Sequence, residues 1–143
     1  MADRQVIADF ARSMGIATSG LRAQAGRMRV ISENIANADS TAPTAGGDPY
    51  RRKVPSFSSA LDRTLDAKVV TLARIRPDQT AYRIKHEPGN PAADAAGNVK
   101  YPNVNPLVEM TDMREAQRSY EANLNIIGAA RRMIQRTLDI LKA

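Results

Sequence analysis

The chain has 143 residues, a net charge of +6, and aromatic residues at only 4% of its positions, which leaves little bulky material for a compact interior. Hydrophobic residues at 43% exclude a wholly disordered chain, and the absence of cysteine excludes disulfides and thiolate metal sites. The sequence has no apolar run long enough for a membrane helix or a cleavable signal peptide. We therefore expect any export from the cytoplasm to use a route that needs no such signal.

The first predicted element is a long helix over Val6–Asn37. Its apolar residues recur in two rows, each with a period of seven and offset by three, which is the a/d pattern of a coiled-coil surface, with Gln24 as the polar interruption. Gly15, Gly20 and Gly26 each cost about 1 kcal/mol relative to Ala in an isolated helix, so we expect close packing against neighbours there. The predicted packing seam is Ile7, Phe10, Met14, Ala17, Leu21, Met28, Ile31 and Ile35.

The string "ENIANADST", Glu33–Thr41, indicates how this helix ends. Asn is the non-glycine residue best suited to the left-handed conformation that ends many helices. We therefore predict Asn37 as a left-handed C-cap, with Asp39, Ser40 and Thr41 bonding to nearby backbone in the exit turn. Capping explains where the helix stops but not the whole string, so the helix-end motif is taken as Asn34, Asn37, Asp39 and Thr41.

The middle of the chain, residues 41–105, is rich in Gly, Pro and Asp and is too long for an ordinary loop. "SFSSALDRTL", residues 56–65, predicts a short helix capped by Ser56. "AKVVTLARIRPDQTAYRIKHEP" predicts two strands joined by a turn at residues 77–80. The following "GNPAADAAGNVKYPNVNP" is predicted to be extended and rich in turns.

A second long helix is predicted over Pro106–Lys142, with Asn105 as N-cap and Pro106 in the first helical position. It again carries two rows with a period of seven, interrupted by Gln117 and Arg131. Two seams of matching length at opposite ends of the chain predict that the helices pair. This second seam is Met110, Met113, Tyr120, Leu124, Ile127, Ile134, Leu138 and Leu141.

Periodicity alone leaves open whether the two helices form a simple intramolecular hairpin or an assembly interface. A pair of helices has too little surface to bury both seams and their flanks. Five apolar residues lie off the main rows and need further partners, which favours assembly: Ala25, Val30, Ile126, Ala130 and Met133.

No residue pattern predicts a catalytic, cofactor-binding or metal-binding site. His86 is the only histidine and has no Cys, His or carboxylate pair near it in the sequence, so a surface position explains it best. Glu87 and Asp94 flank Gly and Pro turns, where turn hydrogen bonding explains them better than metal binding. The sequence therefore predicts a protein that is not an enzyme and holds no cofactor.

The basic residues raise nucleic-acid binding by a basic coiled coil as an alternative function. "YRRK", residues 50–53, and Arg131, Arg132 and Arg136 are candidates for phosphate contacts. The charges are nevertheless spread along the chain, lie among acidic residues and are not interleaved with stacking aromatics. Solvated helix faces and salt bridges explain them better.

Four stretches carry a resemblance to a known family. "SGLRAQAGRMRVISENIANADST", residues 19–41, resembles the N-terminal signature of flagellar axial proteins, the rod and hook components of the bacterial flagellum. "YRRKVPSF" at residues 50–57 and the stretches at 87–106 and 109–141 narrow the resemblance to the short proximal-rod members. Around its Pro-Gly turn this chain has Glu87 and Asn90, where those members commonly have Asp and His.

The resemblance implies a mainly α structural subunit without catalytic activity. Residues 1–40 and 106–143 would pair as an elongated coiled coil, and residues 41–105 would form a small hairpin and extended arms. The subunit would leave the cytoplasm through the flagellar type III export apparatus without a cleaved signal peptide. It would then join copies of itself and other rod proteins in the hollow drive shaft that transmits torque across the periplasm.

Overall fold

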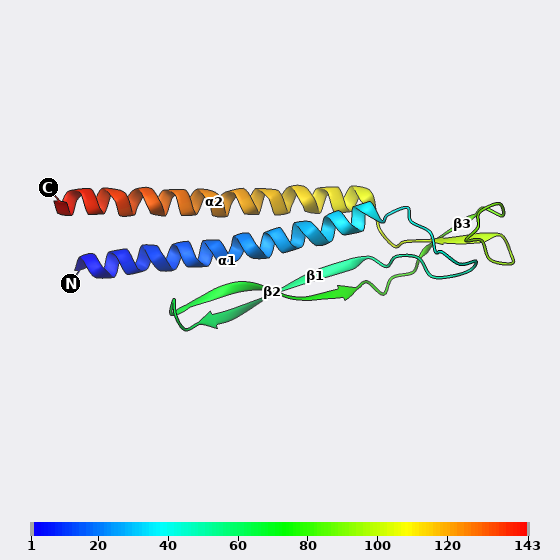
Figure 1. Ribbon diagram of the computed structural model, residues 1–143, viewed down its shortest axis with the longest axis horizontal. Helices are drawn as coiled ribbons and strands as arrows, with labels where there is room; N and C mark the ends of the chain where they lie inside the picture. The colour runs from blue at the N-terminus through cyan, green and yellow to red at the C-terminus, as the bar shows by residue number, and fades with distance from the viewer. Residues whose placement is uncertain (1, 143) are drawn as a thin grey trace. The chain divides into compact units, whose positions relative to one another are not determined.

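The computed structural model describes residues 2–142 and contains two long helices separated by four strands. Helix α1 spans Ala2–Ala36 and α2 spans Pro106–Lys142, with β1 (Lys53–Asp62), β2 (Ala67–Pro77), β3 (Arg83–His86) and β4 (Asn98–Tyr101) between them (Figure 1). The described chain is thus a mixture of helix and strand rather than mainly α, because β1–β2 and β3–β4 form two small sheets. Within residues 2–142, no helix is long and apolar enough to cross a membrane.

The described chain folds into two compact units. Unit 1 contains residues 2–27, 57–73 and 115–142, and unit 2 contains residues 28–56 and 74–114. Both helices and the β1–β2 hairpin contribute to each unit. The compact units therefore combine segments that are far apart in the sequence.

The start of α2 confirms the predicted capping. The side-chain oxygen of Asn105 accepts a hydrogen bond from the backbone N–H of Leu107 (3.1 Å), and Pro106 occupies the first helical position. An N-cap side chain satisfies a helical N–H that would otherwise lack a partner, and Pro at the first position lacks only an N–H that would be unpaired there anyway.

The predicted end of α1 is wrong in its mechanism. Among the described non-glycine residues only Asp66 has a positive φ (48°), so Asn37 is not left-handed. The Asn37 side-chain amide instead donates to the carbonyl of Glu33 (2.8 Å), and the Ser40 hydroxyl donates to the carbonyl of Asn37 (2.9 Å). Side chains thus satisfy helix-end carbonyls that a left-handed turn would otherwise serve.

The short helix predicted over residues 56–65 is also wrong, because this segment forms most of β1 and the turn after it. Ser58 and Thr71 join their hydroxyls across the hairpin (2.9 Å), and the Asp62 carboxylate accepts the backbone N–H of Thr64 (2.8 Å). Serine and aspartate compete with helical hydrogen bonds in this way. As a strand, the segment is hydrogen-bonded to β2 along one edge instead.

Both strands predicted in the run at residues 67–88 exist, but they do not pair with each other. β2 pairs with β1, whereas β3 pairs antiparallel with β4, with Arg83 opposite Tyr101 and His86 opposite Asn98. The intervening Asp78 is drawn to the start of β1, where its N–H donates to the carbonyl of Arg52 (2.8 Å). The turn signal at residues 77–80 therefore changes the direction of the chain without closing a hairpin.

The three glycines of α1 lie at close contacts, as expected. A Cβ added to Gly15 would lie 2.5 Å from a methyl group of Leu65, and one added to Gly26 would lie 2.8 Å from a methyl group of Leu72. At Gly20 it would lie 2.7 Å from the side-chain nitrogen of Asn123. The glycines therefore bring α1 close to the hairpin on one side and to α2 on another, within unit 1.

Candidate assembly surfaces and a buried polar junction

The seam predicted on α1 lies against other parts of the same chain. Ala17 and Ile31 are buried, with 4% and 3% of their surfaces exposed, and the other seam residues are half-buried. In unit 1, α2 reaches α1 through the Arg27–Glu115 ion pair (3.6 Å) and through the contact of Gly20 with Asn123. A step of seven residues forward along α1 thus corresponds to eight residues backward along α2, so the helices are antiparallel there.

Only one of the two rows predicted on α2 lies inward. In the inward row, Met113, Tyr120, Ile127 and Ile134 are half-buried and only its last member, Leu141, is exposed. The apolar members of the other row, Met110, Leu124 and Leu138, are all exposed. The second inward row is displaced by one residue and includes Glu109, Ala116 and Ala130, all buried. Sequence reasoning chose the large apolar residues, but the close approach of the helices selects small ones.

The outer surface of α2 therefore carries uncovered apolar side chains. Besides the exposed row, Ile126, Met133 and Ile140 recur every seventh residue and are 48%, 51% and 75% exposed. Of the residues expected to need further partners, Val30 and Ala130 are buried within the chain, whereas Ala25, Ile126 and Met133 are exposed. An apolar surface of this length on a helix is typical of an interaction site.

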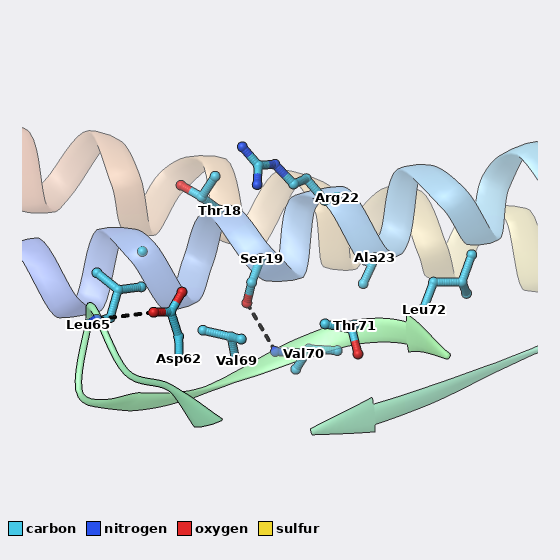
Figure 2. Close-up of a pocket in the computed structure, with 11 residues that line it drawn as sticks. Thr18, Ser19, Arg22, Ala23, Asp62, Leu65, Val69, Val70, Thr71 and Leu72 are labelled. Atoms are coloured by element: carbon cyan, nitrogen blue, oxygen red, sulfur yellow. Dashed lines mark hydrogen bonds between the residues drawn. The ribbon is translucent and has the colours of Figure 1, made fainter. Parts of the chain in front are cut away.

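A groove lies between α1 and the β1–β2 hairpin in unit 1, with a volume of about 540 Å³. Figure 2 shows the side chains of Leu65, Val69 and Leu72 along it, between the strands and the helix. The Ser19 hydroxyl oxygen accepts the backbone N–H of Val70 (3.1 Å), which ties the hairpin to α1. The groove is lined mainly by apolar side chains.

Asn34, a member of the predicted helix-end motif, is the centre of a buried polar junction in unit 2. Its side chain is 1% exposed and uses its full hydrogen-bonding capacity. The amide donates to the Lys53 carbonyl (2.8 Å) and to the Glu109 carboxylate (3.1 Å). The amide oxygen accepts the Tyr50 hydroxyl (2.8 Å) and the Lys53 N–H (2.9 Å). Asn34 thereby joins the end of α1, the entry to β1 and the start of α2.

Glu109 supplies the negative charge of this junction. Its side chain is 1% exposed and accepts the Arg52 guanidinium at 2.5 Å. Arg52 also pairs with Asp78 (3.3 Å) and approaches Asp112 (3.9 Å). A buried carboxylate is stable only when paired and hydrogen-bonded, and both conditions are met here. Sequence reasoning missed Glu109, because an acidic residue in the first turn of a helix suggests only a favourable helix dipole.

The side chains of the basic string at residues 50–53 form contacts within unit 2. The Arg51 guanidinium lies 4.3 Å from the Tyr82 ring centroid and donates to the Asp78 carbonyl (2.9 Å). Lys53 forms an ion pair with Glu33. Burial, reinforced by the nearby Glu33 and Glu109 carboxylates, raises the pKa of Tyr50 to about 12, so its hydroxyl remains a donor to Asn34 at neutral pH. These contacts tie the basic string to the rest of unit 2.

The "YPNVNP" string, residues 101–106, has a structural explanation at each polar position. Asn103 accepts the Arg52 N–H (2.8 Å) and donates to the Asp78 carbonyl (3.1 Å), while Asn105 caps α2. Val104 is buried at 1% exposure. This string, which belongs to one of the stretches that carry the family resemblance, therefore lies beside the polar junction and bonds to Arg52 through Asn103.

The remaining members of the helix-end motif lie outside the junction. Asn37 is half-buried and bonds within its own helix end, and Thr41 is exposed. Asp39 meets Arg83 at 3.5 Å, and the same guanidinium donates to the Ala38 carbonyl (2.8 Å). Of the four residues in the motif, Asn34 alone bonds to α2.

Glu87 and Asp94 serve the β3–β4 region, as expected for turn residues. Asp94 accepts the N–H groups of Ala96 and Asn98 (both 2.9 Å). Glu87 accepts the Asn90 amide (3.1 Å) and the Tyr101 hydroxyl (2.9 Å), and these donors hold its pKa below the ordinary 4.5. His86 is exposed and meets the Asn98 side chain (3.3 Å).

We predict that Tyr101→Phe raises the pKa of Glu87 toward 4.5, because it removes one of the two donors that favour the carboxylate. The stabilisation from Glu87 is fully present above its unfolded pKa and is lost as the pH falls through the lower folded pKa. An NMR titration of the Glu87 side chain would measure the shift. Tyr82→Phe is the control, since the Tyr82 hydroxyl contacts Arg51 instead, and an equal shift in both variants would contradict the assignment.

Comparisons with known proteins find sequence similarity to flagellar rod proteins. Residues 14–42 match a family of flagella basal body rod proteins, and residues 95–140 match the C-terminal family of the flagellar basal body rod FlgEFG proteins. The flagellar basal-body rod protein FlgC of Agrobacterium fabrum is 52% identical, covering 90% of this chain and 92% of that protein. The FlgC proteins of Bacillus subtilis (37% identical; 91% and 97% covered) and Salmonella typhimurium (40%; 87% and 92%) are also similar. The chain belongs to the FlgC family of flagellar basal-body rod proteins.

Proposed function

We propose that this protein is a structural subunit of the flagellar basal-body rod and acts without catalysing a reaction. The observation that carries the proposal is the uncovered apolar surface of α2, on a chain whose relatives are named as rod proteins. A subunit of a helical assembly presents such a surface to its neighbours, and contacts that repeat head to tail generate an open filament.

The finer proposal is that α1 and α2 pair as an antiparallel coiled coil that packs against neighbouring subunits in the proximal rod. The half-buried seam of α1 and the inward row of Met113, Tyr120, Ile127 and Ile134 support this pairing. The exposed row of Met110, Leu124 and Leu138 would then face other subunits instead of α1. Interlocked helices would resist twisting, which is what a hollow drive shaft requires to transmit torque.

The proposed partners are copies of this chain, other rod proteins and the flagellar type III export apparatus. Residues 1–40 and 106–143 would form the coiled-coil core of the rod, and residues 41–105 would bridge adjacent subunits on its outer side. Cryo-EM of isolated basal bodies would test this arrangement directly. Density for the chain outside the rod, or with α2 turned entirely toward solvent, would overturn it.

The assembly surface makes a separate prediction. Leu124→Asp is expected to block rod assembly and swimming while leaving the isolated subunit unchanged, because Leu124 is 47% exposed in the single chain. Motility on soft agar and the circular dichroism spectrum of the purified subunit would measure the two effects. Arg118→Asp, also an exposed position on α2, is the matched control that adds a carboxylate without removing an apolar side chain. Swimming with Asp at position 124 would remove this surface from the assembly interface.

A further prediction concerns the unassembled subunit, whose helix ends are expected to be poorly ordered. Gly15, Gly20 and Gly26 weaken α1, and helix stability comes mostly from packing. Circular dichroism of dilute protein should show much less helix than the assembled rod. Stable, concentration-independent helicity over about half the chain would contradict this expectation.

A further inference from the structure

The two units differ sharply in what they bury. In unit 1, the buried residues among those described are all alanines: Ala17, Ala23, Ala116 and Ala130. Gln24 has its side-chain oxygen buried without a partner among the described residues, which costs about 1–3 kcal/mol. Unit 1 therefore has little apolar burial of its own to support its fold.

Unit 2 has both a larger apolar interior and a satisfied polar one. Val30, Val99 and Val104 are 2%, 0% and 1% exposed, and Tyr101 is 8% exposed. Asn34 and Glu109 lie in the same unit and are joined to each other and to the segment at residues 50–53. Such an interior needs no neighbouring subunit to complete it.

We propose that unit 2 is already folded in the unassembled subunit, and that its Asn34–Glu109 bond is a register clamp that fixes the alignment of α1 and α2. Unit 1 would then open and close readily with its helices in this alignment, and would become stably ordered when neighbours cover its apolar surface. That last step rests on the proposed function, whereas the folded unit and the clamp do not.

The physical basis of the clamp is that buried polar groups are satisfied in only one alignment. A shift of α2 by about one turn would put Met113 in the place of Glu109, and a thioether cannot replace a carboxylate as the acceptor for Arg52. The Asn34 amide would lose the same partner. A single buried polar residue fixes the register of coiled coils for this reason, at some cost in stability.

The first test measures hydrogen exchange along the full chain at low concentration. Amides near Val30 and Val99 should exchange at least about 100-fold more slowly than in an unfolded chain, and those of unit 1 should be protected at least about 10-fold less than these. Asn34→Ala should lower the protection of unit 2 at least about 10-fold. Asn37→Ala removes only a bond within its own helix end and should change it less than about 3-fold. Equal exchange in both units, or an unaffected Asn34→Ala variant, would overturn the proposal.

The second test measures the register of α1 against α2. It distinguishes a clamp from a contact that only stabilises unit 2. The chain has no cysteine, so introduced pairs report without background. The pair Gly20→Cys/Asn123→Cys joins positions in contact, whereas Gly20→Cys/Ile127→Cys is displaced by about one turn. The first pair should oxidise at least about 10-fold faster, and Glu109→Leu should reduce that preference to about 3-fold or less. A preference that survives Glu109→Leu would overturn the clamp. Both tests use the isolated subunit, so they are independent of rod assembly.

Discussion

Glu109→Ala is expected to destabilise unit 2 by about 3–5 kcal/mol, because it leaves the Arg52 guanidinium and the Asn34 amide without their buried partner. The guanidinium is only 22% exposed, so water replaces the carboxylate poorly. The measurement is urea unfolding of the purified subunit, followed through the NMR signals of Val99 and Tyr101. These residues belong to the core of unit 2 and report on its unfolding separately from that of unit 1.

Glu115→Ala is the matched control for this substitution. Glu115 is on the same helix and also pairs with an arginine, Arg27, at 3.6 Å, but its side chain is 66% exposed. An exposed ion pair of this kind contributes less than about 1 kcal/mol. If both variants lost the same stability, burial of the Glu109 carboxylate would not be the cause.

Leu21→Asp or Ile127→Asp is expected to abolish rod completion and leave cells non-motile. Both residues are half-buried members of the inward rows of α1 and α2, and a charge placed there has no compensating partner. The variants should still be expressed, so the defect is measured by electron microscopy of basal bodies alongside motility on soft agar.

Arg22→Ala and Glu121→Ala provide the controls for the seam variants. Both side chains are exposed and lie off the seam, so their truncation should change swimming little. Normal swimming with Asp at both position 21 and position 127 would leave the paired-helix account without support. A defect confined to Leu21→Asp would mean that α1 packs there against the hairpin and not against α2.

The sequence alone predicts the elements whose signals are local. α2 begins at Pro106 and ends at Lys142 as predicted, because Asn105, Pro106 and the helical period all act within a few residues. The inward position of the α1 row follows from its period. The close contacts that α1 makes at Gly15, Gly20 and Gly26 are predictable because glycine has no side chain to keep neighbouring segments away.

Only the tertiary structure decided the features that depend on distant partners. Residues 56–65 are compatible with a helix in isolation, yet residues 56–62 form a strand that is hydrogen-bonded to β2, and the rest form the turn after it. The local sequence is compatible with a left-handed Asn37, but in the folded chain its amide donates to the Glu33 carbonyl instead. On α2, Ala116 is buried and Leu124 is exposed, because only small side chains fit where α1 approaches α2 closely. Asn34 and Glu109 are 75 residues apart in the sequence, and no local pattern predicts the buried hydrogen bond between their side chains. A hydrogen bond between residues so far apart is a property of the folded chain, because only packing brings its donor and its acceptor together and removes water from both.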